Sequence, residues 1–131
     1  MGGEAQLRFD HERNIVYITL EGLVSEQMLL AGFDAAVSAR DYKPGMARLW
    51  DFRKADSSNL DPASFGLIAQ HSADSPPGVR DVKAAFVTAQ PAEFGLARMF
   101  QAHAENIAAA TLRVFDDLGE AETWLTEDAT E

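Results

Sequence analysis

The chain opens with a segment in which apolar and polar positions alternate. Residues 7–11 show this alternation, which is typical of a strand with one face buried. A polar turn at residues 12–14 separates it from residues 15–20, which are rich in β-branched and aromatic side chains. We therefore predict an antiparallel hairpin over residues 6–21.

The next segment has apolar residues at helical spacing. Four of them follow an i, i+4, i+7, i+8 pattern, which gives a helix one apolar face. They are Leu29, Phe33, Ala36 and Val37. Ser25 precedes them, and a serine there caps a helix by accepting a hydrogen bond from a first-turn N–H. The predicted helix begins after Ser25, carries Arg40 in its last turn and stops at Pro44-Gly45.

Strands and helices alternate through the rest of the predicted chain. Strands are predicted at residues 47–52, 83–89 and 112–115, and helices begin at Asp61, Pro91 and Asp117. The 83–89 segment is apolar almost without alternation, which indicates a strand covered on both faces. The predicted order is ββαβαβαβα. It corresponds to an α/β fold with a single mixed, mostly parallel sheet of four to five strands, and four helices distributed over both faces.

Composition adds limits to this picture. The 131 residues suit one domain, 1–131, with a frayed acidic tail at 127–131. The net charge of −10, from 21 acidic and 11 basic side chains, argues against a nucleic-acid partner. The absence of cysteine excludes disulfides and thiolate metal sites. We find neither a membrane span nor a signal-peptide pattern, so a cytoplasmic location is expected.

Two segments resemble a known family. The first is the strand that ends in Asp-x-Arg at residues 51–53, and the second is the closing pattern R-V-F-x-D-x-x-E-A-x-x-W-L at residues 113–125. Together with the predicted element order they are similar to the SpoIIAA-like family of the STAS (sulphate transporter and anti-sigma-factor antagonist) class. The resemblance implies a small, cytoplasmic, STAS-like bacterial protein. It also implies a fold related to the lipid-binding CRAL-TRIO proteins.

The same resemblance suggests a phosphorylation site. STAS antagonists that signal through phosphorylation carry Asp-Ser-Ser-Gly-Leu before their second helix, and this chain has Asp56-Ser57-Ser58-Asn59-Leu60 there. Ser57 and Ser58 are thus the candidate phospho-acceptors that the resemblance implies. The chain departs from the pattern at Asn59, which replaces the glycine, and at Asp61-Pro62, which is the better helix start.

Candidate binding residues lie where the parallel strands end. Ligands of open α/β sheets bind beyond the carboxyl ends of the strands, which here bring Asp51, Arg53 and Gln90 to one edge. Trp50 and Phe94 are the aromatic candidates, and Phe94 falls on the polar side of its predicted helix. The alternative is structural, with Asp51 and Arg53 pairing with neighbouring loops.

Motifs of catalysis are absent. The chain has no Gly-x-Gly-x-x-Gly, no P-loop and no paired-histidine helix, so we expect neither a cofactor nor a metal. His71 and Asp74 have metal-ligand spacing but no third partner in the sequence. An enzyme that uses Asp51 or His103 as a general acid or base is the least favoured hypothesis.

Two functional hypotheses remain. The first is a non-enzymatic STAS-like regulatory or interaction module, which presents residues 53–61 and the third helix to a partner or to a second copy of itself. The alternative is a protein that binds a small apolar or lipid-like ligand, with Arg53 fixing an acidic head group. Its apolar walls would be Met28, Leu29, Phe33, Trp50, Phe86, Phe94 and Met99.

Overall fold

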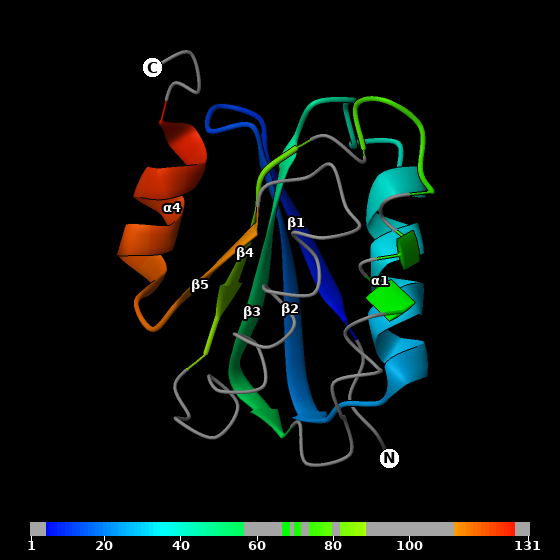
Figure 1. The fold of residues 1–131 in the computed structure, drawn as a ribbon, viewed down its shortest axis with the longest axis vertical. Helices are drawn as coiled ribbons and strands as arrows, with labels where there is room; N and C mark the ends of the chain where they lie inside the picture. The colour runs from blue at the N-terminus through cyan, green and yellow to red at the C-terminus, as the bar shows by residue number, and fades with distance from the viewer. Residues whose placement is uncertain are drawn as a thin grey trace.

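A five-stranded sheet forms the centre of the protein. The computed structural model describes residues 5–56, 67–68, 70–71, 74–79, 82–88 and 112–127. The strands are β1 (Gln6–Asp10), β2 (Ile15–Leu23), β3 (Ala47–Asp56), β4 (Ala84–Val87) and β5 (Leu112–Phe115). They lie in the order β1-β2-β3-β4-β5 (Figure 1). β1 pairs antiparallel with β2, and all other pairs are parallel, which confirms the mixed, mostly parallel sheet.

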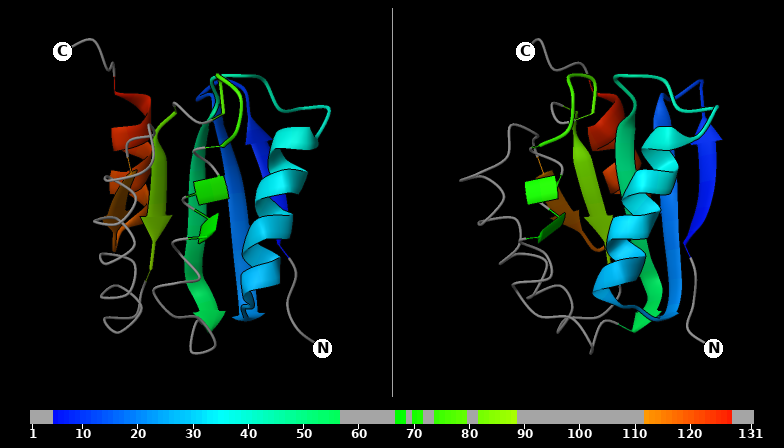
Figure 2. Two further views of the ribbon diagram at one scale, coloured as in Figure 1. Left: turned by 45° about the vertical axis from the view of Figure 1, so that its right-hand side comes forward. Right: turned by 90° about the vertical axis from the view of Figure 1, so that its right-hand side faces the viewer.

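Two helices of the described part cover opposite faces of this sheet. α1 (Glu26–Ser38) lies on one face and α4 (Leu118–Thr126) on the other (Figure 2). Residues 67–68 and 70–71 are helical, as predicted for the second helix. The other residues from 61 onwards that were assigned to it before residue 74, and all those assigned to the predicted third helix, lie outside the described residues. Within the described part, no helix is long and apolar enough to cross a membrane.

The sequential strand order explains this distribution of helices. From β2 to β5 each strand is added beside the preceding one, so the chain crosses the sheet in one direction only. Right-handed crossovers in one direction place their connections on one face, and α1 packs there. α4 follows the last strand and therefore is free to pack on the other face. Helices on both faces were predicted, but in the described part α4 alone occupies the second face.

The core consists of two apolar layers, one on each face of the sheet. The layer under α1 includes Ile18, Leu20, Leu29, Phe33, Trp50, Phe52 and Phe86. The layer under α4 includes Ile15, Tyr17, Leu49, Ala85, Val87, Ala121 and Leu125. Because β4 contributes to both layers, all four of its residues are buried, which confirms the interior strand predicted from the unbroken apolar run.

Two of the three N-caps predicted from the sequence lie in the described part of the chain, and both are present; the third, Asp61, lies outside it. The Ser25 Oγ accepts a hydrogen bond from the Met28 N–H at 3.1 Å, and the Asp117 Oδ2 accepts one from the Glu120 N–H at 2.8 Å. The predicted end of α1 is wrong, because the helix stops at Ser38 and leaves Arg40 outside it. The turn after α1 contains Tyr42, whose hydroxyl donates a hydrogen bond to the Gly78 carbonyl at 2.7 Å. This contact with a distant residue holds the turn in a position that does not continue the helix.

The predicted boundary after residue 52 is also wrong. Arg53 to Asp56 belong to β3 and not to a loop, because β2 itself continues to Leu23. The extended ends of the two strands pair with each other, as in Leu23 beside Asp56. β4 stops level with Asp51, so these ends of β2 and β3 project beyond the rest of the sheet.

Candidate functional site

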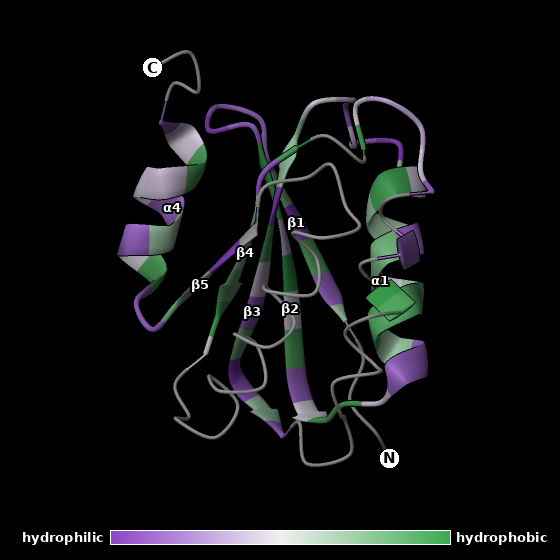
Figure 3. Ribbon diagram, in the orientation of Figure 1, coloured by the Kyte–Doolittle hydropathy of each residue, from purple (hydrophilic) through white to green (hydrophobic). Residues whose placement is uncertain are grey.

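The projecting ends of β2 and β3 bear a hollow of about 530 Å³. We call it the charged hollow, and it is lined by Thr19, Glu21, Asp51, Arg53 and Lys54. Figure 3 shows hydrophilic residues at the ends of these two strands and mainly apolar residues along their middle parts. The charged hollow therefore lies where the apolar core of the sheet ends.

An irregularity in strand pairing gathers the charges at this hollow. Thr19 pairs with Asp51, but Glu21 pairs with Lys54, so β3 has one residue more than β2 between these pairs. Such a bulge changes the alternation of side chains. Phe52 and Ala55 are buried in the layer under α1, and the two residues between them line the hollow together with Asp51. The bulge thus places Arg53 and Lys54 on the same face.

Asp51 and Arg53 form a two-point ion pair. The Arg53 Nε donates to Oδ1 at 2.9 Å and Nη2 donates to Oδ2 at 2.8 Å, while the Arg53 backbone N–H also donates to Oδ1 at 3.0 Å. Burial acts to raise the pKa of the Asp51 carboxyl, but the hydrogen bonds and charge of Arg53 outweigh it and lower the pKa below its ordinary value. Asp51 is therefore a carboxylate, and it holds the guanidinium in one orientation.

We predict that this ion pair makes stability depend on pH. Because the folded protein lowers the pKa of Asp51, the pair stabilises the fold above the ordinary pKa and loses this effect as the pH falls through the lowered pKa. Asp51→Asn is expected to reduce the free energy of unfolding by about 1 kcal/mol at pH 7, since Arg53 is half-exposed. Urea titrations of both proteins from pH 7 to pH 2 should show this difference shrinking towards zero. A constant difference would contradict the prediction.

A second polar cluster lies beside α4 and reaches to the β1–β2 turn at the other end of the sheet. The Tyr17 hydroxyl donates to the Glu122 Oε2 on α4 at 2.6 Å, and the Arg13 Nη1 lies 3.7 Å from the same oxygen. The Arg8 guanidinium lies 3.8 Å above the Tyr17 ring. Burial and the hydrogen bond to Glu122 raise the pKa of Tyr17, so its phenol stays protonated. The apolar layer under α4 is thus bordered, on the side of β1 and β2, by polar groups that pair with one another.

The structure brings together only some of the predicted site residues. Asp51 and Arg53 meet at the charged hollow, where Arg53 pairs with Asp51 itself and not with a loop. Trp50 is 2% exposed on the opposite face and stacks on Phe86 with ring centroids 5.6 Å apart. The other candidates, Gln90, Phe94, Ser57 and Ser58, lie outside the described residues.

Sequence reasoning missed three residues of the hollow, namely Thr19, Glu21 and Lys54. A signal for the first two was present, because polar residues at 19 and 21 alternate with apolar residues at 18 and 20. The position of Lys54 depends on the bulge, for which no local pattern is evident.

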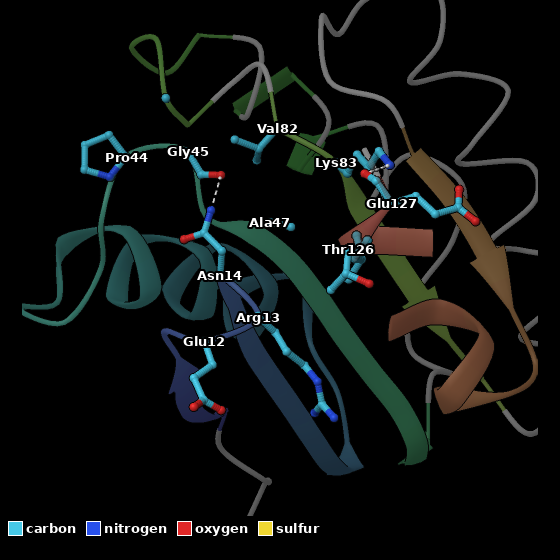
Figure 4. A pocket seen from close by; sticks show the side chains of 12 residues that line it. Glu12, Arg13, Asn14, Pro44, Gly45, Ala47, Val82, Lys83, Thr126 and Glu127 are labelled. Atoms are coloured by element: carbon cyan, nitrogen blue, oxygen red, sulfur yellow. Dashed lines mark hydrogen bonds between the residues drawn. The ribbon is translucent and has the colours of Figure 1, made fainter. Parts of the chain in front are cut away.

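A larger hollow of about 860 Å³ lies at the opposite end of the sheet, beside the β1–β2 turn and the C-terminal end of α4 (Figure 4). Its polar groups bind one another. The Asn14 side-chain amide donates to the Gly45 carbonyl at 3.2 Å, and the Lys83 Nζ donates to the carbonyls of Trp124 at 2.8 Å and Glu127 at 3.2 Å. Lys83 thereby offsets the negative end of the α4 dipole, which is a structural role.

His71 has a partner other than the one its sequence spacing suggested. Its Nε2 lies 2.7 Å from the Asp34 Oδ1 on α1, and its ring packs edge-on against Phe33. The pair joins residues 70–71 to α1. No group of three or more histidine, aspartate or glutamate side chains that could hold a metal ion occurs in the described part of the chain.

Comparisons with known proteins bear on the fold. No family model and no curated protein matches the chain. A solved structure does: it is an uncharacterised protein of the DUF3478 family from Shewanella loihica PV-4, described as having a SpoIIAA-like fold. The match has a TM-score of 0.57 and covers 95% of this chain and 94% of that one.

The fold of this chain is SpoIIAA-like. This finding confirms the architecture implied by the resemblance of the Asp-x-Arg strand and the closing pattern. The two proteins are 12% identical, so the likeness concerns the fold alone. A SpoIIAA-like fold with a charged, internally paired sheet end is therefore the basis for any functional inference.

Proposed function

We propose that this protein is a non-catalytic, STAS-like interaction module that binds a protein partner through the charged hollow and the adjoining sheet surface. The observation that carries this proposal is that Arg53, held in one orientation by Asp51, lies beside the exposed Lys54 at the projecting ends of β2 and β3. Arg53 is fixed by Asp51, so a partner that binds it loses little side-chain freedom.

The strand order favours a surface that binds a macromolecule over a crevice that binds a small ligand. Open α/β sheets form their ligand crevice where the strand order reverses, since neighbouring connections there leave to opposite faces. The order β2-β3-β4-β5 has no such reversal. A macromolecular partner needs no crevice, and a projecting, polar strand end is accessible to one.

The charge distribution also favours this surface. Among the described residues, two basic side chains line the charged hollow, namely Arg53 and Lys54. Two acidic side chains lie with them, namely Glu21 and Asp51. This region is nearly neutral in a chain of net charge −10, so an acidic partner meets less repulsion here than the chain's net charge implies.

The two other hypotheses have less support. Of the predicted apolar pocket walls, Leu29, Phe33, Trp50 and Phe86 are at most 2% exposed and pack in the core under α1. An enzyme that uses Asp51 gains nothing from its lowered pKa, because the carboxylate becomes a weaker base and is not protonated near neutral pH. His103 lies outside the described residues.

We predict that neutralising the two basic residues of the hollow abolishes partner binding. The tagged wild-type protein and an Arg53→Gln/Lys54→Gln variant are used to capture proteins from the native host, and captured proteins are identified by mass spectrometry. A partner should be retained by the wild type and reduced at least tenfold by the variant. The purified partner should then show the same difference in titration calorimetry.

A charge-matched control distinguishes the loss of specific contacts at the charged hollow from the effect of a changed net charge. Arg40→Gln/Lys43→Gln removes the same two charges from exposed positions outside the hollow, and should bind like the wild type. Sedimentation of the isolated protein shows whether the partner is a second copy of the chain. Equal loss of binding in both variants, or none in either, would overturn the proposed surface.

A further inference from the structure

A groove of about 500 Å³ lies between β5 and α4, and it shares no lining residue with the charged hollow. Two aromatic rings contribute to it, from Phe115 on β5 and Trp124 on α4. Three exposed acidic residues flank these rings, namely Asp117, Glu120 and Glu127. Neither the proposed function nor the predicted site uses this groove.

The aromatic rings of the groove already attract cations of the protein itself. Phe115 and Trp124 have ring centroids 5.7 Å apart, and the Arg113 guanidinium lies 5.5 Å from each of them. The Lys83 Nζ lies 5.0 Å from the Trp124 ring. Since the face of an aromatic ring is electron-rich, these contacts show a surface suited to basic side chains.

The backbone of β5 borders the same groove. β5 is the last strand of the described sheet, and β4 pairs with it on one side only. The Phe115 carbonyl accepts the Thr88 N–H at 3.0 Å and so points towards β4. In a parallel strand, neighbouring residues direct their backbone groups to opposite sides, so the N–H and C=O of Val114 point to the outer edge.

We propose that an extended basic peptide adds to the outer edge of β5 as a sixth strand, with alternate lysine or arginine side chains lying in the groove. Backbone hydrogen bonds to the edge supply affinity in this mode of recognition, and side-chain sites supply specificity. The three carboxylates outnumber the two cations near these rings, Arg113 and Lys83, so the groove is complementary to a further cation. The net charge of −10 also attracts a basic peptide from a distance.

The spacings of peptide and groove agree. Alternate side chains of an extended strand on one face are about 7 Å apart. Glu120 and Trp124 are one helical turn apart on α4, which corresponds to a rise of about 6 Å. One peptide cation thus reaches the Glu120 carboxylate while the next reaches the part of the groove that Trp124 and Glu127 line.

Binding of a synthetic peptide tests this inference. The probe is the acetylated and amidated pentapeptide Lys-Thr-Arg-Thr-Lys, followed through tryptophan fluorescence. Trp50 is buried, so a change in emission reports on the half-buried Trp124. We expect a saturable change and slower hydrogen exchange of the Val114 amide. Glu120→Gln/Glu127→Gln should weaken binding at least fivefold.

Two controls distinguish strand addition from general attraction. Glu26→Gln/Asp41→Asn removes two charges from other exposed or half-buried positions and should leave the affinity within twofold. The same pentapeptide with alternate backbone nitrogens methylated keeps its charges but cannot pair with a strand, and should bind at least tenfold more weakly. Absence of saturable binding would overturn the inference, as would equal binding of both peptides or equal loss in both variants.

Discussion

Replacement of Gly78 by alanine is expected to lower the free energy of unfolding by about 3 kcal/mol. Gly78 has φ +89°, and a Cβ at this residue would lie 2.7 Å from the Pro44 Cβ and 3.3 Å from its Cα. Neither side moves easily, because the Gly78 carbonyl accepts hydrogen bonds from the Gly45 N–H at 2.8 Å and the Tyr42 hydroxyl at 2.7 Å. Urea unfolding followed by circular dichroism measures the loss.

Gly45→Ala is the matched control. Gly45 has φ +99°, but a Cβ there would meet nothing within 4 Å. Gly45→Ala therefore adds backbone strain but no steric clash, and it should lower the free energy of unfolding by only about 1 kcal/mol. If the two variants were equally destabilised, the contact between Gly78 and Pro44 would not determine the cost, and the two loops at this end of the sheet would be less tightly joined than the structure shows.

The parts of the fold that follow from the sequence are those with a local cause. Ser25 and Asp117 cap their helices because a side-chain oxygen reaches a first-turn N–H within the same short segment. The 84–87 run is apolar throughout because this strand lies between two layers, and that burial pattern is present in the residues themselves.

The parts that did not follow from the sequence depend on distant partners. The continuation of β3 to Asp56 requires the end of β2 beside it, and residues 53–56 alone have too many polar side chains to indicate a strand. α1 ends at Ser38 because the next turn is anchored through Tyr42 to Gly78, 36 residues further along the chain. Such contacts leave no periodic signal.

The candidate site was predicted in part for the same reasons. Asp51 and Arg53 share a strand and are two residues apart, so the period of a strand alone brings them to one face. Trp50 precedes Asp51 directly, and the same period places it on the other face, where the structure has it. The adjacency of Trp50 and Asp51 in the sequence therefore does not make them neighbours at a site.

The burial of Trp50 leads to the largest expected effect. Trp50→Ala should lower the free energy of unfolding by about 4 kcal/mol, because it removes a large ring from a packed interior and leaves a cavity. The ring is 2% exposed, stacks on Phe86 with planes 7° apart, and lies in the core layer under α1. Urea unfolding followed by circular dichroism measures this loss without relying on tryptophan emission.

Trp124→Ala provides the comparison within the same chain. Trp124 is half-buried at the edge of the layer under α4, so its removal should cost only about 1–2 kcal/mol. A wall of an open ligand pocket would behave like Trp124, since water already reaches one side of such a ring. If Trp50→Ala proved as mild as Trp124→Ala, Trp50 would not be a core residue, and the hypothesis of an apolar ligand would regain its principal wall.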